Sequence, residues 1–202
     1  MLNFLKNYWF FIGISSLVLV LLLLEPTSSN WLAYRRLSIS NGEVWRFITP
    51  NLVHLGVVHT LMNLVGFWLI VLIFRPLLKM QDWIIWIISL YILNIVGIHL
   101  FLPELSRYVG MSGALYGLIS AACVAEMRFK VKLSALLLII VGLKIFAPQI
   151  FGIRAEYNDL IGGYVVEESH IIGFIQGIFV GLLWPKSRLN KPAFEALIQK
   201  KK

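Results

Sequence analysis

A serine between glycines is the clearest candidate nucleophile in the chain. Ser112 lies in the stretch Gly110-Met111-Ser112-Gly113, where an apolar run begins. The glycines let a substrate or another backbone segment approach closely. Backbone N–H groups at a helix N-terminus can also stabilise an oxyanion. Serine is a common helix N-cap as well, so the motif alone leaves a catalytic role and a capping role open.

Two further groups of polar residues lie in other apolar runs. His170 begins the last run, and His59 and Asn63 lie in the second one. Their i, i+4 spacing puts His59 and Asn63 on one helix face, where both can donate hydrogen bonds to an oxyanion. His54 is placed to brace the loop above them. Interhelical hydrogen bonding without catalysis is the alternative role for these side chains.

The composition describes the environment in which these residues must work. Of 202 residues, 59% are apolar and 14% are charged, and the mean hydropathy is +0.82. A soluble domain carries about 25% charged residues, so the composition excludes a water-soluble globule and a disordered chain. The single cysteine, Cys123, excludes an intramolecular disulfide and a site made of several thiolates. The net charge of +8 does not follow a basic face with interleaved aromatics, so no nucleic-acid partner is predicted.

Six apolar segments predict an all-α, polytopic membrane protein of one domain. Its core covers about residues 8–185, and a basic tail covers 186–202. No small-x-small cleavage site follows the first segment, so we interpret it as a membrane helix rather than a signal peptide. Pro103 and Pro148 are expected to end the third and fifth spans. The predicted spans are residues 8–24, 51–74, 83–102, 112–127, 133–146 and 169–184.

The charges between the spans predict the orientation. With the N-terminus in the cytoplasm, the cytoplasmic segments hold twelve basic and three acidic residues, and the opposite side holds six basic residues, Lys144 included, and seven acidic ones. This bias favours six spans with both termini in the cytoplasm. The second, fourth and sixth spans then run in one direction. Ser112, His170, His59 and Asn63 are therefore expected at one depth near the outer face, whereas a transporter would carry polar residues at several depths.

Small residues on two of the spans predict that these spans touch. Glycine recurs every four residues in the fourth and sixth spans, and such spacing lets membrane helices pack closely. Packing alone explains the pattern, but this contact would also bring Ser112 within hydrogen-bond reach of His170. Tyr116, one turn below the serine, would then stack on the imidazole. The glycines are Gly113, Gly117, Gly173, Gly177 and Gly181.

Residues that are absent narrow the chemistry further. No acidic residue lies deep in any span, which disfavours an aspartyl intramembrane protease. No H-E-x-x-H motif is present, which disfavours a zinc protease. No metal or cofactor is therefore predicted. Without an acid beside the histidine, the expected arrangement is a Ser–His dyad rather than a Ser–His–Asp triad.

Together, these motifs resemble the rhomboid intramembrane serine proteases. The resemblance covers about residues 31–184 and rests on Trp45-Arg46, His54, His59 with Asn63, Gly110 to Gly113 with Tyr116, and His170 followed by Gly173 and Gly177. It implies that Ser112 is the nucleophile and His170 the base. It also implies that His59 and Asn63 join the Ser112 N–H in the oxyanion hole. Ser169 stands where the family usually has alanine.

Three stretches are similar to the rhombosortase subfamily: L-S-I-S-N-G-E-V-W-R-F-I-T, Y-V-G-M-S-G and I-G-G-Y-V-V-E-E-S-H. This similarity implies a bacterial inner-membrane enzyme with its active site near the periplasmic side. It also implies single-pass substrates with a C-terminal Gly-Gly motif, a helix and a basic tail, cleaved during sorting or type II secretion. The product would go to water or, as in a sortase, to an amine. The alternative is a catalytically silent rhomboid-like protein that binds or escorts membrane clients, and such proteins lack the serine or the histidine.

Overall fold

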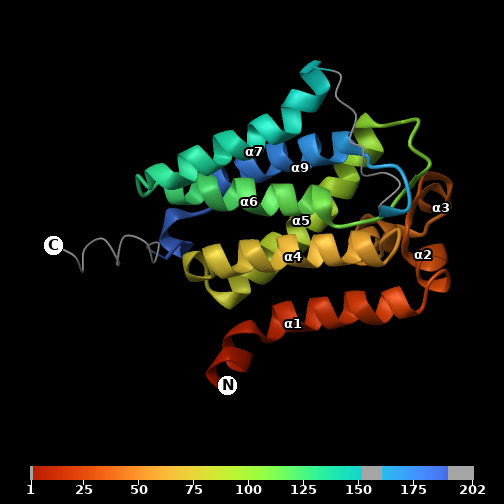
Figure 1. Ribbon diagram of the computed structural model, residues 1–202, viewed down its shortest axis with the longest axis horizontal. Coiled ribbons are helices and arrows are strands. Elements are labelled where there is room, and N and C mark those ends of the chain that lie inside the picture. Colours follow the sequence, from red (N-terminus) through yellow and green to blue (C-terminus); the bar gives the residue numbers. More distant parts are fainter. Residues whose placement is uncertain (1, 152–160, 191–202) are drawn as a thin grey trace.

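The computed structural model describes residues 2–151 and 161–190. The chain forms a bundle of roughly parallel and antiparallel helices (Figure 1). Its long helices are α1 (Leu2–Leu23), α4 (Val57–Phe74), α5 (Met80–Phe101), α6 (Ser112–Met127), α7 (Lys132–Phe151) and α9 (Glu167–Leu183). Each corresponds to one of the six predicted apolar segments.

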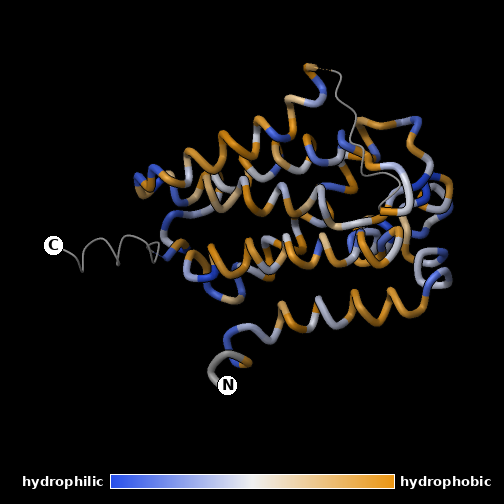
Figure 2. The backbone as a smooth tube through the Cα atoms, viewed as in Figure 1, coloured by the Kyte–Doolittle hydropathy of each residue, from blue (hydrophilic) through white to orange (hydrophobic). Residues whose placement is uncertain are grey.

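The apolar composition of the helices fits a membrane. Among the described residues, four segments are long and apolar enough to cross a bilayer: Leu5–Leu23, Val57–Leu77, Met80–Phe101 and Lys132–Phe151. Apolar residues run along the helices, and hydrophilic residues gather toward the two ends of the bundle (Figure 2). Many large apolar side chains on the outer faces of α4 and α7 are exposed, as expected for surfaces that face lipid.

Helix α6 lies in the middle of the bundle and forms the centre of the core (Figure 1). Most of its side chains are buried, and it contacts α4, α5, α7 and α9. Its 16 residues extend for about 24 Å, which is less than the roughly 30 Å of a bilayer's hydrocarbon core. Ser112 is the first residue of this short central helix.

The polar segment between α1 and α4 folds onto one end of the bundle. It contains α2 (Thr27–Leu32), α3 (Arg36–Ser40) and two 3-10 turns (Val44–Phe47 and Thr49–Leu52). Strand β1 (Tyr34–Arg35) pairs antiparallel with β2 (Arg107–Tyr108), which holds this segment against the chain that leads into α6. This short pairing is a departure from the purely helical prediction.

The opposite end of the bundle gathers three segments that carry basic residues. Arg75 Nε donates to the Asn7 carbonyl, 3.2 Å away, and the Asn190 N–H donates to the Leu77 carbonyl at 2.8 Å. Arg188 forms an ion pair of 2.5 Å with the buried carboxylate of Asp82. The start of α1, the α4–α5 turn and the chain after α9, in the 3-10 turn Lys186–Arg188, therefore lie together.

Two predicted boundaries were wrong. The second span does not start near residue 51, because Pro50 and Gly56 interrupt the chain and α4 begins only at Val57. His54 consequently lies in a loop. The fifth span does not end before Pro148, since α7 continues through this proline to Phe151. Proline deprives the helix of one backbone hydrogen bond, but membrane helices tolerate this loss.

Candidate active site

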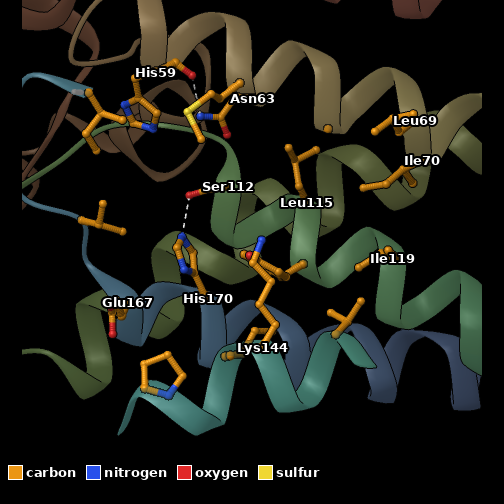
Figure 3. Close-up of a pocket in the computed structure, with 18 residues that line it drawn as sticks. His59, Asn63, Leu69, Ile70, Ser112, Leu115, Ile119, Lys144, Glu167 and His170 are labelled. Carbon is orange, nitrogen blue, oxygen red and sulfur yellow. Dashed lines mark hydrogen bonds between the residues drawn. The ribbon is translucent and has the colours of Figure 1, made fainter. Parts of the chain in front are cut away.

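Ser112 and His170 meet at the N-terminal ends of two adjacent helices. Ser112 begins α6, and His170 lies in the first turn of α9. The Ser112 Oγ and His170 Nε2 atoms are 2.9 Å apart, a normal hydrogen-bond distance (Figure 3). Among the residues that the structure describes, no carboxylate pairs with His170. The geometry is that of a serine–histidine pair without a third member.

Contacts between glycines hold the two helices together. A Cβ atom added to Gly173 or Gly177 would overlap the carbonyl oxygen of Gly113 or Gly117 on α6, and one added to Gly181 would lie 2.5 Å from the Ala121 carbonyl oxygen. Ser120 Oγ adds a 2.9 Å hydrogen bond to the Phe174 carbonyl of α9. The glycine spacing thus serves the close contact that the sequence predicted. This contact fixes the distance between the serine and the histidine.

Gly110 shapes the turn that leads into α6. Its φ of +111° lies in the region that side chains disfavour. A Cβ here would also lie 2.8 Å from His59 Cε1. The Gly110 N–H donates to the Pro50 carbonyl at 2.9 Å. Glycine is therefore required here both by the backbone conformation and by the approach of His59 to the serine loop.

The surroundings of His59 determine which of its nitrogens carries the proton. The Leu55 N–H donates to His59 Nδ1 at 3.3 Å, so Nδ1 accepts and a neutral ring carries its hydrogen on Nε2. This Nε2 atom is the one that would lie 3.0 Å from a Cβ at Gly110. His59 therefore presents an N–H donor beside the turn that precedes Ser112.

Asn63 lies one turn further along α4 and faces the same space. Its Nδ2 atom donates to the His59 carbonyl at 2.9 Å, and its Oδ1 atom is buried without a partner in the structure. An amide nitrogen has two hydrogens, so one N–H remains for another acceptor. His59 and Asn63 thus share one face, as their spacing predicted.

The Tyr116 ring packs against the imidazole of His170. The ring centroids are 4.7 Å apart and the planes are tilted by 50°. This agrees with the expectation from its place one turn below Ser112. The contact supports one face of the imidazole while its Nε2 points at the serine.

A cavity of about 670 Å³ opens in front of the pair. It has the size typical of small-ligand sites. Apolar side chains from α4, α6 and α7 form most of its wall, and the polar groups gather near Ser112 (Figure 3). The polar residues of its lining are His59, Asn63, Ser112, Tyr116, Lys144, Glu167 and His170.

The side chains of Arg46, Trp45 and His54, which were predicted to support the site, lie outside this cavity. The buried Arg46 side chain pairs with Glu43 at 2.6 Å and donates to the carbonyls of Ala33 and Asn30, so it ties the segment between α1 and α4 together. Trp45 Nε1 donates to the Trp31 carbonyl at 3.1 Å. His54 packs edge-on against His59, with ring centroids 5.1 Å apart. Burial, and to a smaller extent His59, lowers the pKa of His54 to about 3, so this ring is neutral at pH 7.

The sequence did not single out a group of polar side chains behind the serine. Tyr108 and Asn94 are buried, and Ser169 Oγ lies 3.3 Å from the Tyr108 hydroxyl. Asn94 fits against Gly113, whose missing side chain leaves the space for it. Burial raises the pKa of Tyr108, which keeps the phenol protonated. An asparagine within an apolar span was the available signal.

Comparisons with known proteins cover this same part of the chain. The Rhomboid domain family matches residues 41–187, which include Ser112, His170, His59 and Asn63. Over 82 residues the chain is 33% identical to a Bacillus subtilis (strain 168) protein named "Putative rhomboid protease YdcA". This match covers 41% of the present chain and 41% of that protein. The chain thus spans less than half the length of this relative.

Proposed function

Because the chain belongs to the rhomboid family, we propose that it is an intramembrane serine protease with a Ser112–His170 dyad. The observation that carries the proposal is the 2.9 Å contact between Ser112 Oγ and His170 Nε2 at the edge of a cavity. A nucleophile and a base within hydrogen-bond reach are the minimum for acyl transfer. A silent, client-binding member of the family has no need of this pairing.

The reaction follows from the positions of the two side chains. Neutral His170, with its proton on Nδ1, takes the hydroxyl proton of Ser112 on Nε2 as Oγ attacks the peptide carbonyl carbon. The imidazolium then gives that proton to the departing amine, which leaves an ester on Ser112. Water attacks the ester with His170 again as the base, and the imidazolium returns the proton to Ser112 Oγ as the carboxylic acid leaves. An amine in place of water would give sortase-like transfer.

The oxyanion of each tetrahedral intermediate requires donors beside Ser112. The Ser112 N–H lies at the start of α6, where it has no intrahelical acceptor. His59 Nε2–H and the second N–H of Asn63 supply two side-chain donors on the α4 side. Donors that are fixed before the reaction stabilise the transition state without reorganisation.

The apolar helices and the family describe a multi-pass membrane protein. We assign it to a bacterial inner membrane with six spans. The end that carries Arg75, Lys79 and Arg188 then faces the cytoplasm, as the excess of basic residues favours. In this orientation Ser112 opens toward the periplasmic side. Reporters fused to the C-terminus and within residues 149–168 test the orientation.

The proposed substrates are single-pass proteins with a Gly-Gly motif, a membrane helix and a basic tail at the C-terminus. The similarity of three sequence stretches to rhombosortases supports this class. The chemistry also suits glycine, because an intact helix hides its carbonyl groups and glycine unwinds a helix at low cost.

Cleavage of a defined substrate tests the function. The purified protein in lipid is expected to cut a reporter that carries Gly-Gly, a helix and a basic tail, and a matched Val-Val reporter should be cut far more slowly. The Ser112→Ala protein, checked for folding by its melting temperature, should cut neither. Cleavage that persists in Ser112→Ala would remove the serine protease from consideration. Equal cleavage of the two reporters would remove the Gly-Gly preference only.

A further inference from the structure

The cavity contains a cation that the dyad chemistry does not use. Lys144 is on α7, and Figure 3 shows its side chain extending into the cavity toward α6. Its Nζ atom lies 5.9 Å from the centre of the Tyr116 ring. The other neighbour of that ring is the His170 imidazole. The Tyr116 ring therefore contacts both the Lys144 ammonium group and the His170 imidazole.

This ammonium has no anionic partner among the described residues. Of the acids there, Glu167 lines the same cavity, but its carboxylate accepts a 2.8 Å hydrogen bond from Gln149. No ion pair within the described part of the chain includes Lys144. The face of Tyr116 attracts the cation but does not neutralise it.

The apolar wall of the cavity would strengthen the attraction between the Lys144 ammonium group and an anion. Lys144 is exposed, but apolar side chains line the cavity that it enters. Charges attract each other more strongly beside apolar groups than in bulk water. The apolar side chains that line this cavity include Leu115, Ile119, Val141 and Ile145. A carboxylate that entered with the substrate would accept a charge-assisted hydrogen bond from this ammonium group.

We propose that Lys144 is a specificity-determining residue that binds a carboxylate side chain of the substrate near the scissile bond. The inference rests on the proposed protease function and names the substrate chemistry. An extended peptide advances about 3.3 Å per residue, so the separations around Tyr116 place the acidic residue within about three residues of the cut. A lipid phosphate on the same ammonium is the competing occupant, and the test separates the two.

The test uses reporter helices that differ only in having Asp or Asn at one position. Each single-pass reporter helix carries Gly-Gly and a basic tail. In each pair of reporters, either Asp or Asn stands at one of the three positions on either side of the scissile bond. The protein in neutral-lipid bicelles is expected to prefer Asp at one position by about tenfold in kcat/KM, the scale of one hydrogen bond to a charged group. Lys144→Gln should lose this preference, Lys144→Arg should keep it, and Lys144→Glu should prefer a Lys-containing helix. Lys132→Gln, at the other end of α7, is the matched control and should behave as the unaltered protein.

Several results would overturn the inference. They are equal use of Asp and Asn helices at every position, a preference that survives in Lys144→Gln, or an equal slowing of all helices by Lys144→Gln. Dependence on added anionic lipid without an Asp preference would assign the ammonium to a lipid.

Binding of the same fluorescent helices separates this inference from the protease function. If no helix is cut but the Asp helix binds more tightly in a Lys144-dependent way, the recognition stands and the protease proposal fails. If helices are cut and bind without an Asp preference, the protease proposal stands and the recognition fails.

Discussion

The two walls of the cavity are built in different ways. On one side, α6 and α9 touch through glycines so closely that a single Cβ would overlap the opposing backbone. On the other side, α7 contributes Val141, Lys144 and Ile145 to the cavity, yet only 11% of its apolar stretch is buried inside the protein. The two atoms that we propose to react belong to helices in backbone contact, whereas the wall beside them is held by few buried side chains.

This difference matches the geometric demands of the two tasks. The proposed proton transfer between Ser112 and His170 depends on a distance near 2.9 Å, and a misplacement of about 1 Å can cost roughly 10²-fold in rate. The proposed recognition of a substrate carboxylate by the long Lys144 side chain tolerates more variation in position. We therefore assign the proposed chemical step to the closely packed helices α6 and α9, and the proposed substrate recognition to the loosely packed helix α7.

Substituting one glycine in each wall should give the largest contrast. Gly173→Ala would push α9 away from the Gly113 carbonyl, so cleavage should fall by about 10²-fold or more and stability by about 1–3 kcal/mol. Gly142→Ala on α7 is the control, because its Cβ would lie 3.4 Å from Phe174 Cζ, an ordinary contact. It should keep activity and gain up to about 1 kcal/mol. Cleavage rates and melting temperatures measure both, and similar behaviour of the two variants would contradict the contrast.

The α4 residues should show an intermediate effect confined to the rate. His59→Ala or Asn63→Ala should slow single-turnover cleavage by about tenfold to hundredfold, because the remaining donors still serve the oxyanion. A role in packing alone would instead lower stability by about 0.6 kcal/mol with normal turnover. Single-turnover rates and melting of the same variants decide between the two. Normal rates with reduced melting would assign both residues to packing.

Tyr116 joins the two walls, and its replacement should have the smallest effect. Tyr116→Leu removes the ring from His170 and from Lys144. We expect cleavage to slow by about fivefold, the factor that corresponds to an aromatic contact of about 1 kcal/mol. Tyr116→Phe keeps the ring and should remain near normal. If Phe is as slow as Leu in cleavage assays, the hydroxyl rather than the stacked ring matters.

The sequence was most informative where periodicity and topology act together. The i, i+4 spacing of His59 and Asn63 and the glycine repeats on α6 and α9 needed only the helix period. The common depth expected for Ser112, His170 and the His59–Asn63 pair followed from three spans that run in one direction. The pairing of Ser112 with His170 could therefore be predicted before any coordinates.

Features that depend on tertiary contacts could not be predicted in this way. Pro148 indicates a helix end in an isolated chain, but the membrane setting lets α7 continue. The sequence indicated only that Lys144 is a charged residue near the end of a predicted span, because residue spacing does not predict which cavity a long side chain enters. Asn94 is accommodated only because Gly113 is opposite it on another helix.

Labelling of Ser112 by a fluorophosphonate tests the central claim most directly, since it needs no substrate. The probe forms a bond to a serine oxygen that a neighbouring base has activated. The protein in lipid should be labelled at Ser112, as located by mass spectrometry, and labelling should be lost in Ser112→Ala and in a folded His170→Ala variant. Gly142→Ala should label normally. Undiminished labelling in His170→Ala, or labelling at another residue, would contradict a Ser112–His170 dyad.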